Sequence, residues 1–120
     1  MKGSISPGLR VLVVEDECAI AAFLEAILAD MGCLVVGPAA TLEQALELGR
    51  NRAIDAAFLD IKLGGEHSTL VGDALEERKI PFVLMTGYDG PIDGYRPAVV
   101  LKKPFGAQGL EDALASCLNA

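Results

Sequence analysis

The sequence predicts a three-layer α/β sandwich, in which helices cover both faces of a parallel β-sheet. Three observations lead to this fold class. Short apolar runs alternate with segments of helical periodicity, which is the pattern of parallel strands joined by crossover helices. Residues 56–59 are apolar at every position and fit a strand buried on both faces. The 120 residues suit one domain, which we place at residues 9–120 after a flexible lead-in of residues 1–8.

The first strand and the first helix follow this lead-in. Apart from Arg10, residues 9–14 are apolar and rich in valine, which predicts the strand. Asp16 or Glu17 would cap the start of the helix, and Gly32 would stop it. The side chains expected to face the core recur at steps of three and four: Ile20, Phe23, Leu24, Ile27, Leu28 and Met31.

Turn and cap signals divide the middle of the chain. Residues 34–36 predict the second strand, which the Gly-Pro dipeptide at 37–38 would close. Residues 41–44 (Thr-Leu-Glu-Gln) are a capping box, and the helix that they open should run to about Gly49. The buried run at residues 56–60 is then the third strand.

Glycines and prolines shape the second half. A loop is expected after the two glycines at 64–65, followed by a helix near residues 70–78 and a fourth strand at 80–85. Residues 87–97 are so rich in glycine and proline that a fourth helix should be short or absent. Residues 98–101 predict the fifth strand. The last helix should direct three leucines inward: Leu110, Leu114 and Leu118.

Polar side chains follow four of the predicted strands, at the point where each strand ends: Glu15 and Asp16, Asp60, Thr86, and Lys103. A parallel sheet would collect them at one edge. Neighbouring carboxylates repel one another unless a cation lies among them, and Mg²⁺ suits such oxygen ligands. Asp60 would then be a nucleophile that forms an acyl phosphate, with Lys103 and Thr86 contacting the phosphoryl oxygens. Alternatively, the two acidic residues of the first strand only load the N-terminus of the next helix.

Together with Pro104 and Phe105 after the lysine, these residues resemble the receiver domain of bacterial response regulators. The resemblance covers the chain from about residue 9 to 120. It implies a flavodoxin-like (βα)5 fold with a five-stranded sheet in the order 2-1-3-4-5. It also implies a phosphorelay function, in which phosphorylation switches binding to another protein.

By this resemblance, Asp60 is the phosphoacceptor. The donor would be a histidine of a sensor histidine kinase or of a histidine phosphotransfer protein, and the downstream protein target is left open. Mg²⁺ would be held by Asp60, by Asp16 directly, by Glu15 through water and by the Lys62 backbone carbonyl.

The resemblance further implies that Lys103 contacts the phosphoryl group and precedes a cis peptide bond to Pro104. Thr86 would move toward the phosphate and pass the signal outward. Two positions depart from the family pattern, because Val100 stands where many receivers have an aromatic residue and Gly64 stands where a proline is usual. These departures affect the expected signalling face and leave the phosphorylation chemistry untouched.

Residues 63–66 and 81–88 are similar to a subgroup of single-domain receivers called FATGUY, which act without an output domain inside a phosphorelay. Of the name motif, Thr-Gly and a hydrophobic residue are retained. Lys62 and Tyr88 are bulky and would flank the path of the hydrolytic water, so we hypothesise slow self-dephosphorylation. Alternatively, both side chains point into solvent.

Other reactive residues receive no catalytic role. His67 is the only histidine and is expected in a solvated loop. Tyr95 and Phe105 would either contact a partner or anchor loops. The three cysteines lie far apart, form no CxxC pair and are expected as reduced core residues: Cys18, Cys33 and Cys117.

The charge and the hydrophobicity of the sequence exclude some classes of binding partner. The net charge of −7 argues against DNA binding, and no apolar run is long enough to span a membrane. We expect a cytoplasmic monomer or weak homodimer that catalyses only its own phosphoryl transfer and dephosphorylation. A second hypothesis is a pseudo-receiver scaffold that is never phosphorylated. A third is a phosphatase with an aspartyl nucleophile, but Lys62 occupies the position where such enzymes need a second aspartate.

Overall fold

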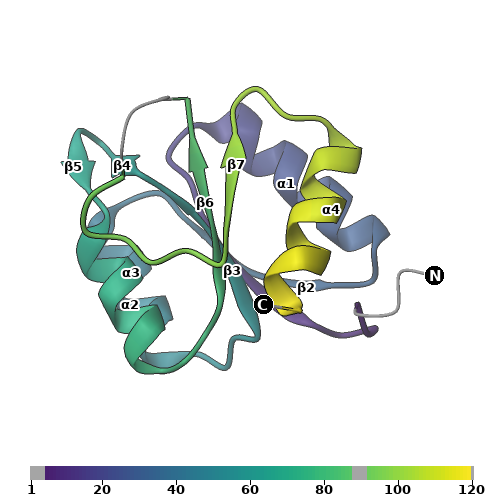
Figure 1. The fold of residues 1–120 in the computed structure, drawn as a ribbon, viewed down its shortest axis with the longest axis horizontal. Coiled ribbons are helices and arrows are strands. Elements are labelled where there is room, and N and C mark those ends of the chain that lie inside the picture. The colour runs from purple at the N-terminus through teal and green to yellow at the C-terminus, as the bar shows by residue number, and fades with distance from the viewer. Residues whose placement is uncertain (1–4, 88–91, 120) are drawn as a thin grey trace.

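The computed structural model describes residues 5–87 and 92–119, and it shows a parallel sheet between two layers of helices (Figure 1). The five strands of this sheet are β1 (Arg10–Val14), β2 (Leu34–Ala39), β3 (Ala56–Asp60), β6 (Phe82–Thr86) and β7 (Val99–Lys102). They lie in the order β2-β1-β3-β6-β7, and each neighbouring pair is parallel. Counted among themselves they have the order 2-1-3-4-5, which confirms the expected flavodoxin-like sandwich.

The helices pack in pairs on the two faces of the sheet (Figure 1). They are α1 (Cys18–Asp30), α2 (Leu42–Asn51), α3 (Thr69–Glu77) and α4 (Ala107–Leu118). One core lies between the sheet and α1 with α4, and it includes Leu24, Phe58 and Leu114. The other lies between the sheet and α2 with α3, and it includes Leu59 and Leu75. Because β3 is buried at all five positions, the strand that carries Asp60 is rigidly held between both cores.

The first helix begins and ends near the predicted residues, but two details of the prediction are wrong. Glu17 is the N-cap residue by position and makes no side-chain capping hydrogen bond. Phe23 does not face the core and is 38% exposed, because its ring lies at the surface against Phe105 of the β7–α4 loop. Gly32, with φ of 86°, follows the helix as expected.

The second strand runs through the Gly-Pro dipeptide instead of stopping before it. β2 is an edge strand, so Pro38 can lie in it without removing a hydrogen bond from a central ladder. Gly37 has φ of 97°, and a Cβ at this position would lie 2.8 Å from the Ala39 nitrogen. The pairing of β1 with β2 is irregular at this point, between Leu12 and Val14.

The Thr41 half of the capping box predicted for α2 is confirmed, while the Gln44 side chain bonds the residue before the N-cap in place of the N-cap amide. The Thr41 hydroxyl accepts a hydrogen bond from the Gln44 N–H at 3.1 Å. The Gln44 side chain reaches back to the Ala40 N–H, at 3.0 Å. The helix extends to Asn51, two residues beyond the predicted end.

The expected loop after β3 contains a small antiparallel hairpin that was not predicted. Its strands are β4 (Lys62–Leu63) and β5 (Glu66–His67). Gly64 and Gly65 form the connecting turn with φ of 56° and 88°, the backbone of a two-residue hairpin turn.

Between β6 and β7, the described residues contain no helix, as the glycine and proline content predicted. Gly87 and residues 92–98 are not helical, and residues 88–91 lie outside the described part. Ile92 and Tyr95 of this segment pack against the core beside α2 and α3.

Three smaller observations complete the fold. At the start of the chain, Gly8 donates a backbone hydrogen bond to the Gly32 carbonyl at 2.8 Å. Cys33 and Cys117 are buried as expected, but Cys18, the first residue of α1, is exposed. No helix in the described ranges is long and apolar enough to cross a membrane.

Candidate functional site

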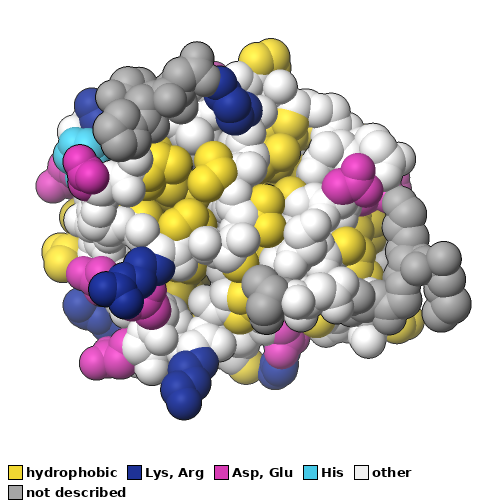
Figure 2. All heavy atoms as spheres, viewed as in Figure 1, with side chains coloured by type: hydrophobic (Ala, Val, Ile, Leu, Met, Phe, Trp, Pro, Cys, Tyr) yellow, Lys and Arg dark blue, Asp and Glu magenta, His cyan; other side chains and the backbone are white. Residues whose placement is uncertain are grey.

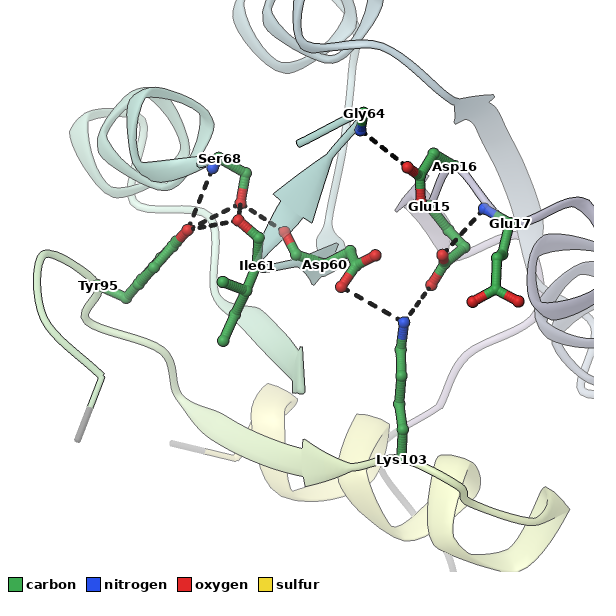
Figure 3. A network of polar contacts seen from close by, with 9 residues as sticks. All are labelled: Glu15, Asp16, Glu17, Asp60, Ile61, Gly64, Ser68, Tyr95 and Lys103. Carbon is green, nitrogen blue, oxygen red and sulfur yellow. Dashed lines mark hydrogen bonds and ion pairs between the residues drawn. The ribbon is translucent and has the colours of Figure 1, made fainter. Parts of the chain in front are cut away.

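The polar residues predicted to meet at one edge of the sheet do meet there. Asp60 ends β3 and Thr86 ends β6, while Glu15 and Lys103 directly follow β1 and β7. Because all these strands are parallel, their carboxyl ends share one edge (Figure 1). Figure 3 shows the side chains of Glu15, Asp60 and Lys103 converging.

Lys103 lies between two carboxylates. Its Nζ is 3.0 Å from Glu15 Oε1 and 3.4 Å from Asp60 Oδ1. The Glu15 side chain is completely buried, and its Oε2 also accepts a hydrogen bond from the Glu17 N–H at 3.1 Å. A buried carboxylate needs hydrogen-bonding or charged partners, and Lys103 and the Glu17 amide supply them to Glu15.

The Asp60 carboxyl is largely buried and lies near the negative charge of Glu15 as well as the positive charge of Lys103. Its side chain is only 13% exposed. Burial and the charge of Glu15 raise the pKa of Asp60 to about 6, although Lys103 opposes this shift. Burial lowers the pKa of Lys103, but hydrogen bonding and charge from Glu15 and Asp60 outweigh burial, so the pKa of Lys103 is raised overall.

Glu15, Asp16 and Asp60 fit a hard divalent cation. Each offers a carboxylate oxygen, and these three oxygens lie within 4.8 Å of one another. The donors are all oxygens, and Lys103 supplies one positive charge beside three carboxylates. Asp16 is exposed, and its Oδ2 accepts a hydrogen bond from the Gly64 N–H at 2.8 Å (Figure 3). The β4–β5 hairpin therefore positions one of the three candidate ligands.

A cavity of about 580 Å³ opens beside this group. Its polar wall includes Asp60 and the buried Thr86, and its apolar wall includes Ile61 and Ile92. Figure 2 shows apolar side chains reaching the surface between the β4–β5 hairpin and β7. A donor group that approaches Asp60 from this side would thus contact both apolar and polar side chains.

The remaining predicted residues take varied positions. Lys62 and His67 are exposed on the hairpin and line the same cavity. The peptide bond between Lys103 and Pro104 is cis, as the resemblance implied. Tyr88 lies outside the described residues.

A second group of hydrogen bonds, which was not predicted, surrounds the backbone at the end of β3. It joins Ser68, which is fully buried, to Tyr95 and to the backbone carbonyls of Asp60 and Ile61 (Figure 3). From the sequence, Tyr95 was expected either to contact a partner or to anchor a loop. The structure shows that it anchors a loop. Nothing in the sequence near Ser68 indicates that its side chain turns back toward β3.

Comparison with known proteins gives a consistent result. The profile of the response regulator receiver domain family matches residues 11–115. The phyllosphere-induced regulator PhyR of Methylorubrum extorquens is 31% identical over an alignment of 115 residues, and the match covers 91% of this chain and 43% of PhyR.

Two solved structures share the fold closely. SdrG from Sphingomonas melonis Fr1 is 42% identical, with a TM-score of 0.82, and the match covers 94% of this chain and 98% of SdrG. The response regulator PhyR from Brucella abortus is 27% identical, with a TM-score of 0.84, and the match covers 98% of this chain and 51% of that chain. The chain therefore spans about half the length of these PhyR proteins and nearly the full length of SdrG.

Proposed function

This chain belongs to the response regulator receiver domain family, and on that premise we propose that it is the phosphoacceptor of a phosphorelay, phosphorylated on Asp60. The observation that carries the proposal is the placement of the Asp60 carboxylate between two further acidic residues and a lysine at 3.4 Å. A carboxylate at the open end of a buried strand, with a cation beside it, is suited to attack a phosphoryl group.

In the proposed reaction, an oxygen of the Asp60 carboxylate attacks the phosphorus of a phosphohistidine on a partner protein. The new O–P bond replaces the N–P bond, and the released imidazole nitrogen takes a proton from solvent. The donor would be a sensor histidine kinase or a histidine phosphotransfer protein. The product is an acyl phosphate on Asp60, whose charge would change the binding of a further protein.

The residues around Asp60 have distinct roles in this proposal. Lys103 pairs with Asp60 before transfer and with a phosphoryl oxygen afterwards, which requires only a small movement of its flexible side chain. Glu15 holds Lys103 in place through the 3.0 Å ion pair. Thr86, at the wall of the cavity, would donate a hydrogen bond from its hydroxyl group to another phosphoryl oxygen. Asp16, Asp60 and the Lys62 carbonyl, with Glu15 through water, would hold Mg²⁺, which would neutralise charge on the phosphoryl oxygens.

The test uses Mg²⁺ and acetyl phosphate with intact-mass measurement. Wild type should gain one phosphoryl group, and Asp60→Asn should gain none. Asp73→Asn is the matched control, because it makes the same acid-to-amide change at an exposed position on α3 and should be phosphorylated like wild type. Omitting Mg²⁺ should abolish the adduct. If neither acetyl phosphate nor a phosphorylated kinase modifies wild type, the pseudo-receiver hypothesis replaces this proposal, and turnover of added phosphomonoesters would favour the phosphatase.

Slow loss of the phosphoryl group remains a prediction. Lys62 is exposed beside the cavity, where a hydrolytic water would approach Asp60. Replacing Lys62 and Tyr88 with alanine should shorten the lifetime of the acyl phosphate, measured by intact mass after removal of the donor. An unchanged lifetime would show that neither side chain restricts the water.

A further inference from the structure

The hydroxyl groups of Ser68 and Tyr95 hold the backbone directly behind the phosphoacceptor. The Ser68 hydroxyl contacts the Asp60 carbonyl and, at 3.0 Å, the Ile61 carbonyl. The Tyr95 hydroxyl donates to the Ile61 carbonyl at 2.9 Å and accepts from the Ser68 N–H at 3.2 Å. The two hydroxyl oxygens are themselves 3.0 Å apart. Each hydroxyl has one proton, so the pair satisfies both carbonyls when Ser68 donates to Asp60 and Tyr95 donates to Ile61.

The Ser68 side chain makes these contacts and does not cap the helix that it precedes. It is the N-cap residue of α3, a position where a serine side chain normally accepts a hydrogen bond from an amide of the first helical turn. Here it makes no such capping bond, and its side chain is completely buried. The hydroxyl is therefore committed to the end of β3, where a buried carbonyl without a partner would be costly.

Tyr95 brings the β6–β7 segment into the same network. Its ring packs against α3 at Gly72, where an added Cβ would lie 3.4 Å from Tyr95 Cδ1 and 3.5 Å from Phe82 Cζ. The ring also belongs to the core beside α2 and α3. Tyr95 thus ties residues 92–98 to the end of the phosphoacceptor strand by packing and by hydrogen bonds.

We propose that Tyr95 is a positioning residue that couples Asp60 to residues 92–98, so that this segment responds when Asp60 is phosphorylated. Any movement of the Asp60 or Ile61 backbone on phosphorylation changes hydrogen bonds that Tyr95 makes, and Tyr95 is part of the segment. This inference rests on the proposed function, because phosphorylation of Asp60 is the event to which the segment would respond. The tether, meaning the hydrogen bonds between Tyr95 and the end of β3, is present without phosphorylation.

The first experiment measures the tether without phosphorylation, by amide hydrogen exchange followed by NMR. Tyr95→Phe keeps the ring and removes only the hydroxyl, so the fold should be retained. We expect exchange of the amides of residues 92–98 to rise by about tenfold, because the Tyr95 hydroxyl loses its hydrogen bonds to Ser68 and to the Ile61 carbonyl. The Ser68 amide keeps its 2.9 Å hydrogen bond to the Ile61 carbonyl and should change less. Thr41→Val is the control, since it removes a different hydrogen-bonded hydroxyl and should accelerate exchange only at the start of α2. Wild-type exchange rates in Tyr95→Phe would overturn the tether.

The second experiment measures the coupling. Acetyl phosphate and, separately, beryllofluoride as a phosphoryl mimic are added with Mg²⁺, loading is measured by intact mass or titration, and NMR shift changes are recorded. In wild type and Thr41→Val, residues 92–98 should shift on loading. In Tyr95→Phe and in Ser68→Ala, loading should stay within about twofold, while shift changes in this segment should fall by more than half.

The outcomes separate the two proposals. Loading of Tyr95→Phe with shift changes of wild-type size in residues 92–98 would overturn the coupling and leave the proposed function intact. Failure of wild type to take up either probe would overturn the proposed function and the coupling with it. The exchange experiment would still decide the tether.

Discussion

Removing the phosphoacceptor carboxylate should stabilise the protein when Mg²⁺ is absent. Asp60→Asn replaces a carboxyl group with an amide of the same shape, and it removes one negative charge from the group formed with Glu15. The pKa of Asp60 is raised from 3.8 to about 6 by burial and by Glu15, although Lys103 opposes the shift. Each pKa unit corresponds to about 1.4 kcal/mol, so the rise corresponds to about 3 kcal/mol at most. Water at the open side of the site and added salt reduce this, and we expect a gain of about 1–3 kcal/mol for Asp60→Asn at pH 8.

The sign of the pH dependence follows from the direction of the shift. Between about pH 4 and pH 6 the folded protein keeps a proton on Asp60 that the unfolded chain has released. The free energy of unfolding of wild type therefore falls, relative to that of Asp60→Asn, as the pH rises through this window, and the difference levels off above about pH 7. Below pH 4 both side chains are uncharged in both states, and the two proteins should have similar stability.

Urea unfolding with a chelator at pH 4, 6 and 8 measures this difference. Asp73→Asn, at an exposed position of α3, should show no comparable trend. Adding Mg²⁺ at pH 8 should stabilise wild type more than Asp60→Asn, because the ion binds only the folded arrangement of carboxylates. If Asp60→Asn is less stable than wild type at pH 8 in chelator, the account of the site as an uncompensated acidic group is wrong.

Three further predictions test the site and the core. Lys103→Met removes the cation from both carboxylates and should raise the pKa of Asp60 above about 6, as read from the pH titration of its carboxyl carbon by NMR. It should also destabilise the protein at pH 7 by roughly 2–4 kcal/mol, and a pKa that stays near 6 would contradict the role given to the lysine. Phe58→Ala, at a fully buried position of β3, should cost about 3–5 kcal/mol in urea unfolding, and a cost under about 1 kcal/mol would contradict the packing. A thiol reagent should label the exposed Cys18 in the native protein and spare Cys117, whose pKa burial raises to about 11, until the chain unfolds; equal labelling rates would contradict this.

Much of the fold and the chemical centre of the site could be predicted from local patterns. A strand with apolar side chains on both faces is buried on both faces wherever it lies, so the apolar run before Asp60 identified β3. Parallel strands place their carboxyl ends together, so residues that follow separate strands could be assigned to one edge. The glycines and prolines after Thr86 excluded a regular helix by backbone geometry alone. None of these inferences needs the distance between two particular side chains.

Other features depend on contacts between distant parts of the chain. Phe23 follows the helical pattern of its neighbours, yet its ring pairs at the surface with Phe105. The end of β2 was placed too early, because only the order of strands in space shows that Pro38 lies at an edge. The hydrogen bond from Gly64 to Asp16 joins residues 48 positions apart, which the pairing of β1 with β3 and the β4–β5 hairpin bring together.

The sequence by itself determined that this protein has a parallel sheet with Asp60, Glu15, Asp16, Thr86 and Lys103 at one edge, since apolar periodicity and strand direction are local properties. Only the tertiary structure decided which charges pair there and that Ser68 turns from its helix to the backbone of β3. It also decided that Tyr95 joins the phosphoacceptor strand to the segment before β7. Hydrogen bonds and ion pairs depend on separations of about 3 Å, and side chains far apart in the sequence reach such separations only after the chain has folded.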